Sequence, residues 1–220
     1  MKHHTFTLFV IMLTAPLAGM SQVQDTLVLH DFKEYLSKFK RVAAPFDSSK
    51  QDTTALPKKP GTVTPTVTKK FITQFLGEDT VNFEKFVYRY GYIFELTPDF
   101  ITVLAIKLNY GKNDFEDYFE DYLVVYTPDG KLLSKQNIGM VNDNYYIAHI
   151  IDSAKVITKQ IINDYSKELD DDTYRCDVGI SEHSVDKDGN IIGRAVAKKS
   201  GRILFISNKY GSTFELIMDE

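Results

Sequence analysis

The chain of 220 residues contains a single cysteine and no tryptophan. Because Cys176 has no partner, an intramolecular disulfide is excluded, and stability must come from burial of apolar side chains. Its surroundings, YRCDVGI, are typical of a strand, which predicts a small buried residue at Cys176 and not a nucleophile. Without tryptophan, only tyrosine and phenylalanine can supply rings that stack on a sugar.

Charge of one sign and catalytic motifs are also scarce. The chain has 26 Lys and Arg against 30 Asp and Glu, a net charge of −4, which is too small and too mixed for a nucleic-acid-binding surface. There is no GxSxG, P-loop, GxGxxG or CxxC motif, and His30, His149 and His183 do not follow HxH or HExxH spacing. We therefore predict no cofactor, no metal and no nameable catalytic residue.

The N-terminus has the features of an export signal. Lys2 precedes an apolar run over residues 6–17, which is shorter than the roughly 20 residues that span a bilayer. Small residues follow, which predicts a signal peptide over residues 1–21 with cleavage between Ser21 and Gln22. No cysteine lies at that point, so we expect an exported protein, periplasmic or secreted, that is not a lipoprotein and keeps no transmembrane segment after cleavage.

Residues 22–46 predict an N-terminal helical segment, in which residues 27–41 form an amphipathic helix that ends before Pro45. Its apolar positions are Val28, Phe32, Tyr35, Leu36 and Phe39. This stripe must be covered, either by the downstream domain or by a partner protein. Residues 47–68 hold three prolines and six threonines and predict a linker or a long surface loop.

Residues 69–220 change to short runs rich in Val, Ile, Tyr, Phe and Thr, which predict strands. The eleven runs are FITQFL, FVYRYGYIFEL, FITVLAIKL, YLVVY, KLLSKQNI, YYIAHII, KVITKQII, YRCDVGI, NIIGRAVA, RILFIS and TFELIM. Asp-Gly at 129–130 and 188–189 predicts hairpins, and residues 199–201 and 209–212 predict further turns. The expected fold class is mainly β: an antiparallel meander, either a sandwich or a rolled, half-open barrel, with one N-terminal amphipathic helix. A meander closed around a small ligand is the alternative.

Two acidic segments contain enough carboxylates to suggest calcium sites. The segment starting at Asp186 lacks the glycine and the glutamate of an EF-hand at the required places, and a hairpin turn explains it without a metal. Asp170, Asp171 and Asp172 fall between two expected strands, where a polar loop is needed. Neither segment predicts a metal.

The segment FEDYFEDY is the most concentrated acidic and aromatic part of the chain. It consists of Phe115, Glu116, Asp117, Tyr118, Phe119, Glu120, Asp121 and Tyr122. Helical spacing would place the four rings on one face, whereas strand spacing separates nothing before Leu123. We interpret residues 111–116 as a loop and the chain from about Phe119 as a strand, with rings on the sheet surface and carboxylates in water. The eight residues are the predicted partner-binding patch.

Two short motifs, F-x-x-Y-L-x-x-F…P-F over residues 32–46 and T-x-D-G-K-L over residues 127–132, resemble those of small exported proteins of unassigned function from Gram-negative bacteria. The resemblance implies a signal peptide followed by a Tyr-rich β domain and carries no activity. The expected function is an exported, non-catalytic β domain that binds a protein or glycan partner in the cell envelope. A small-ligand calyx and a hydrolase that uses loop carboxylates remain alternatives.

Overall fold

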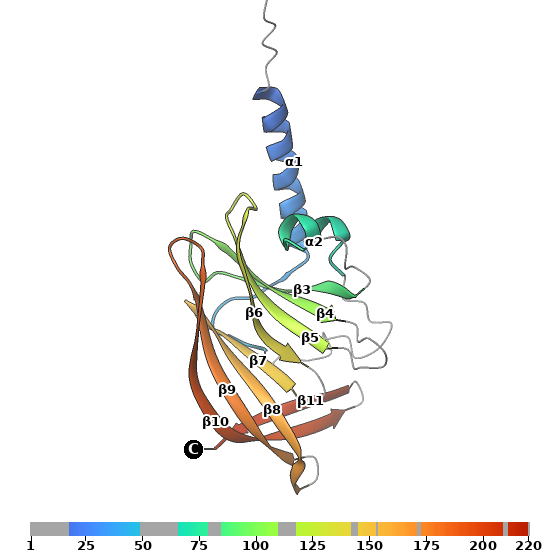
Figure 1. Ribbon diagram of the computed structural model, residues 1–220, viewed down its shortest axis with the longest axis vertical. Helices are drawn as coiled ribbons and strands as arrows, with labels where there is room; N and C mark the ends of the chain where they lie inside the picture. The colour runs from blue at the N-terminus through green and yellow to red at the C-terminus, as the bar shows by residue number, and fades with distance from the viewer. Residues whose placement is uncertain are drawn as a thin grey trace, which may run out of the picture.

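The computed structural model describes residues 18–48, 66–78, 85–109, 118–141, 145–152, 154–170, 173–208 and 211–219. This part of the chain is mainly β and forms two sheets, with two helices beside the first of them (Figure 1). Sheet A has the order β1-β3-β4-β5-β6, and sheet B, which curls into a half-barrel, has the order β11-β10-β9-β8-β7-β2. The predicted fold class is therefore confirmed.

The bounds of the elements are as follows. The helices are α1 (Ala18–Ser37) and α2 (Lys69–Phe75). Sheet A consists of β1 (Lys40–Arg41), β3 (Phe86–Phe94), β4 (Ile101–Asn109), β5 (Tyr118–Tyr126) and β6 (Leu132–Val141). Sheet B consists of β2 (Phe46–Asp47), β7 (Tyr145–Asp152), β8 (Lys155–Asp170), β9 (Thr173–Val185), β10 (Ile191–Asn208) and β11 (Gly211–Met218).

Consecutive long strands pair antiparallel, from β3 to β6 and again from β7 to β11, as expected for a meander. Both Asp-Gly hairpin turns are present. The amide of Gly130 donates to the carbonyl of Thr127 at 3.0 Å, and that of Gly189 donates to the carbonyl of Asp186 at 3.1 Å. Both glycines have positive φ, 94° and 83°, which explains why glycine follows aspartate there.

Two strand-level predictions are wrong. The run FITQFL is not a strand but most of α2, because Phe71, Ile72 and Phe75 fall on one helical face and are all buried. The expected turn at residues 199–201 does not exist either. These residues lie inside β10, where Gly201 pairs with Cys176 of β9, so two predicted strands are one continuous strand. The predicted turn residues Lys209 and Tyr210 lie outside the described residues.

The helix α1 docks on the β domain through its predicted apolar stripe. Phe32, Tyr35 and Phe39 are buried in one cluster with α2 and sheet A, which confirms the domain as the surface that covers the helix. The helix ends at Ser37 and not at residue 41, because Lys40 and Arg41 pair in parallel with β3. It begins at Ala18 and so runs across the predicted cleavage point, and cleavage there stays a prediction. Neither described helix is long and apolar enough to cross a membrane.

The predicted linker is attached to the sheets at both described ends. Asp47 belongs to β2, and the hydroxyl of Ser48 accepts a hydrogen bond from the amide of His149 at 2.8 Å. At the other end Thr66 bridges to Arg89, and Val67 is buried. Residues 49–65 of the linker lie outside the described residues.

The face of sheet B that is buried changes along the length of its strands. On β8 the buried positions are Val156 and Thr158 near its start but Ile161 and Asn163 farther on, with no register shift between them. Neighbouring residues of a strand point to opposite faces, so a change from even to odd positions is a change of face. The first face packs against sheet A around Leu104 and Leu123, and the second forms a separate cluster.

Candidate functional site

Strand β5 divides the acidic and aromatic tandem between the two faces of sheet A. Residues 115–117 lie outside the described residues, whereas Tyr118 to Tyr122 open β5, which confirms the predicted strand from about Phe119. Leu123 packs in the cluster that joins the two sheets, and Tyr122 packs in the cluster beneath the helices. Alternation therefore points Asp121 towards sheet B, and Glu120 towards the helices.

The face towards sheet B contains an inter-sheet cluster, which consists of Asp121, His149, Thr158 and His183. His149 Nε2 lies 2.7 Å from Asp121 Oδ2, and His149 Nδ1 lies 3.2 Å from Thr158 Oγ1. The exposed fractions of Asp121, His149 and Thr158 are 7%, 3% and 2%. The expectation that the tandem carboxylates face water is therefore wrong for Asp121, because β5 pairing turns this side chain into the interior.

The hydrogen bonds of the cluster define the roles of its members. A carboxylate can only accept, so His149 Nε2 donates to Asp121, and in the neutral ring Nδ1 accepts from the hydroxyl of Thr158. Carboxylate, imidazole and hydroxyl are also the groups of a nucleophilic triad. A nucleophile must contact its substrate, and Thr158 is enclosed between the sheets. The array is arranged to hold the sheets together, since β5 supplies the carboxylate while β7 and β8 supply its partners.

His183 is the unusual member of the cluster. Its exposed fraction is 5%, and neither ring nitrogen has a hydrogen-bond partner in the part of the chain that the structure describes. Burial, and then the nearby His149, lower the pKa of His183 below its ordinary value. Both causes disfavour the imidazolium of His183, because a charge inside the protein loses its hydration and is repelled by positive charge nearby.

We expect the free energy of unfolding to fall as the pH drops below about 6.5, the ordinary pKa of histidine. Because the folded pKa of His183 is lowered, the unfolded chain binds more protons there, and each such group costs at most about 1.4 kcal/mol per pH unit. Urea denaturation at about pH 7.5 and 5.5 measures the loss. His183→Leu should reduce it, whereas His30→Gln, at an exposed histidine, should not. Equal losses in all three proteins would refute this assignment.

The face towards the helices contains a charged and aromatic cluster. The carboxylate of Glu78, just beyond α2, accepts hydrogen bonds from the ammonium of Lys135 of β6 at 2.5 Å and from the hydroxyl of Tyr88 of β3 at 2.7 Å. The ammonium of Lys107 of β4 lies 3.7 Å from the same carboxylate. Burial opposes ionisation of Glu78, but the bonds from Lys135 and Tyr88 outweigh it and lower the pKa of the carboxyl. Burial, then the bond to Glu78, raises the pKa of Tyr88 well above its usual range.

Aromatic rings enclose the two lysines of this cluster. The ammonium of Lys107 lies 4.2 Å from the ring centroid of Phe86, and that of Lys135 lies 5.1 Å from that of Tyr122. Lys135 also donates to the carbonyl of Leu76 at 2.9 Å, which satisfies a backbone acceptor at the end of α2. Both ammonium groups thus share the carboxylate of Glu78, and the cluster fastens the segment at the end of α2 to sheet A.

Glu120 of the tandem belongs to the same face. Its two carboxylate oxygens accept from the amides of Asn109 at 2.9 Å and Asn137 at 3.0 Å, and from the hydroxyl of Tyr122 at 3.3 Å. Burial, and then the charge of Glu120, raises the pKa of Tyr122 to about 12. Glu120 is half-buried and bonded across three strands, so little of its charge is available to a partner.

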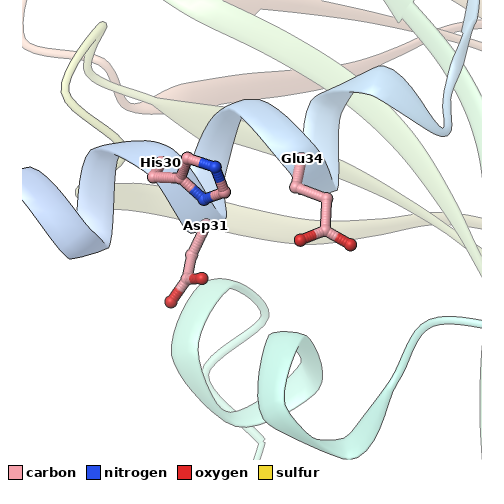
Figure 2. Close-up of side chains that lie close together, drawn as sticks. All are labelled: His30, Asp31 and Glu34. Carbon is pink, nitrogen blue, oxygen red and sulfur yellow. The ribbon is translucent and has the colours of Figure 1, made fainter.

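One group of possible metal ligands was missed from the sequence, because it follows none of the patterns with two histidines. His30, Asp31 and Glu34 project from neighbouring turns of α1, with their ligand atoms within 4.8 Å of one another (Figure 2). Asp31 is already paired with Lys70 of α2 at 2.6 Å. Because an ammonium already neutralises Asp31, the more enclosed of the two carboxylates, we assign no metal to this group.

The structure also describes Cys176, Asp186 and Asp170, three further polar positions from the sequence. Cys176 is buried, as expected, and burial followed by the charges of Asp177 and Asp219 raises the pKa of its thiol to about 11. The carboxylate of Asp186 accepts from the amides of Asp188 and Asn190 within its own hairpin turn. Asp170 ends β8, and Asp171 and Asp172 lie outside the described residues.

Comparisons with known proteins do not add a relative. No protein-family model, no curated protein and no solved structure matches this chain.

Proposed function

We propose that this protein is an exported, non-catalytic β protein that binds a protein or glycan partner in the bacterial cell envelope, in the periplasm or outside the cell. One observation carries the proposal. On β10, the side chains of Ile192 and Val196 are 51% and 50% exposed, on either side of the exposed Arg194. Large apolar side chains that stay in water on one strand are typical of surfaces that are covered by a partner.

The polar clusters favour binding over catalysis. Thr158, the hydroxyl of the Asp–His–Thr array, is buried, and the carboxylate of Glu78 is neutralised by Lys135. A general acid or base must reach its substrate, so groups that are enclosed and already paired are poorly placed for hydrolysis. The hydrolase alternative therefore has less support than binding.

The acidic and aromatic tandem remains a second proposed contact. Tyr118 and Phe119 are half-buried at the start of β5, directly after residues 115–117. Half-buried rings are suitable anchors for a partner. Because Asp121 and Glu120 form hydrogen bonds inside the protein, the docking role of the tandem would depend on the residues that precede Glu120.

Site-specific photocrosslinking tests the main proposal. With a photoreactive amino acid at position 192, we expect a discrete adduct in the envelope fraction of the producing bacterium. The same group at Leu27, which is 61% exposed on α1, serves as the matched control and should give none. The purified chain should begin at Gln22. A cytoplasmic chain that keeps residues 1–21 would refute export, and identical patterns at both positions would refute docking on this face.

A small-ligand calyx is the second candidate function, and His183 is the observation that favours it. An imidazole enclosed between two sheets without a hydrogen-bond partner is a group that a small polar ligand could satisfy. Native mass spectrometry of the protein purified from its own cells would detect a retained ligand as added mass. We expect His183→Leu to abolish that added mass, and observation of the bare chain mass alone would refute the calyx.

A further inference from the structure

The first half of β8 points a row of cations away from sheet A. Val156 and Thr158 face the interior there, so Lys155 and Lys159 face the opposite side by strand alternation. The same holds on β10, where Arg194 is paired in register with Glu182 of β9, the residue opposite Ile157 of β8. A register shift between Ala195 and Ala197 then brings Lys199, opposite Val178, to this same side, and Val196 lies in that bulge. A basic patch results, which we define as Lys155, Lys159, Ile192, Arg194, Val196 and Lys199.

The patch has more positive than negative charge. Lys155 and Arg194 share one carboxylate, that of Glu182, at 2.7 and 2.8 Å. Neither Lys159 nor Lys199 forms a salt bridge with a described residue. Among the described strand residues, Asp152, at the end of β7 opposite Lys155, is the second carboxylate on this side. Four cations thus face two carboxylates in a chain whose net charge is −4.

The side chains of the patch also limit which chemical class of partner fits it. Its two most exposed apolar groups, Ile192 and Val196, are aliphatic, and the aromatic residue on this side of β9, Tyr174, is half-buried in the separate cluster around Ile161. Protein interfaces usually centre on aromatic, Met or Arg anchors in a desolvated core. A sheet face with spaced cations and exposed aliphatic groups fits a flexible polyanion better, because a flexible chain can bring one anionic group after another to the cations along the strands.

We infer that the basic patch binds an anionic polysaccharide, with carboxylate or sulfate groups of the polymer on Lys159 and Lys199 and with sugar C–H groups on Ile192 and Val196. This inference rests on the proposed binding function and specifies the chemical class of the partner. The attraction is local, since the protein as a whole is negative, so a polyanion is repelled everywhere except where cations gather. Binding of this kind weakens steeply with added salt, because each contact releases a counterion.

The test uses the purified protein with dextran sulfate as the anionic probe and neutral dextran as its control. The variant carries Lys159→Glu and Lys199→Glu. The matched variant carries Lys33→Glu in α1 and Lys38→Glu directly after it, both at exposed positions, and has the same change of net charge. We expect the dissociation constant for dextran sulfate at low salt to rise at least about tenfold in the patch variant and to change less than about twofold in the α1 variant.

Equal weakening in both variants, or equal binding of neutral dextran, would overturn the inference. If Lys159→Glu prevents folding, Arg194→Gln with Lys199→Glu, both at exposed positions, takes its place and the same weakening is expected. Different results would refute the proposed binding function and the proposed polysaccharide partner. An adduct at position 192 together with no binding of dextran sulfate would retain a partner on this face but make it a protein, whereas the absence of any adduct would remove the partner itself.

Discussion

Replacing Tyr35 by alanine is expected to lower the free energy of unfolding by about 3–5 kcal/mol, the usual cost of deleting a large buried aromatic side chain. Tyr35 is fully buried and lies at the centre of the contact between α1 and the β domain. Its ring packs against those of Phe32, Phe39, Phe71, Phe75, Tyr90 and Tyr126. The cavity left by alanine would open all of these contacts at once.

Urea denaturation followed by circular dichroism measures the loss. Leu27→Ala, on the same helix but 61% exposed, should change the free energy of unfolding by less than about 0.5 kcal/mol. The hydroxyl can be tested separately, because Tyr126 donates to the carbonyl of Phe75 at 2.9 Å and Tyr35 lies 3.1 Å from Tyr126. Tyr35→Phe should cost about 1 kcal/mol. Similar small losses for both Tyr35 variants would contradict the docked helix.

Replacing Asp121 by alanine is expected to cost about 3–5 kcal/mol, because the change leaves the buried His149 without its partner between the sheets. Glu120→Ala is the matched control. Glu120 is the adjacent carboxylate of the same tandem, but it is only half-buried, and the loss of its hydrogen bonds should cost about 1 kcal/mol. The two acids are neighbours in one sequence motif, but in the structure Asp121 is buried and Glu120 is half-buried.

A double-mutant cycle strengthens this test. If the bond from His149 to Asp121 is the cause, removing both side chains should cost clearly less than the sum of the single losses, because the double variant leaves neither the carboxylate nor the imidazole of this bond unpaired. The same urea denaturation serves, with one protocol for all four proteins. Additive losses, or equal losses for Asp121→Ala and Glu120→Ala, would show that Asp121 does not hold the sheets together.

Several elements could be predicted from the sequence because their causes are local. An Asp-Gly pair demands a turn with positive φ, and Gly130 and Gly189 are found in such turns. The apolar spacing of Phe32, Tyr35 and Phe39 marks one side of a helix wherever that helix docks. The burial of Cys176 likewise follows from its strand context.

Other elements could not be predicted, because their local patterns suit two structures. In FITQFL the apolar residues Phe71, Ile72 and Phe75 suit a helix, but the run has the length of a strand, and only its packing against α1 and sheet A decides between them. The segment at residues 199–201 looks like a turn, yet pairing with β9 keeps it extended. The partners of Glu78 and Lys107 are separated by tens of residues, so no spacing reveals them.

The sequence by itself determined that this protein is a mainly β meander with a docked N-terminal helix, since hydrophobic periodicity and turn residues act over a few positions. Only the tertiary structure decided which carboxylates are exposed. The registers of β4, β5 and β6 turn Asp121 inward to His149 and Glu120 towards the helices, and one residue of register would exchange them. Alternation on β8, together with the register shift at Ala195 and Ala197 of β10, gathers the cations of the basic patch, because side chains far apart in sequence share a face only once strands pair.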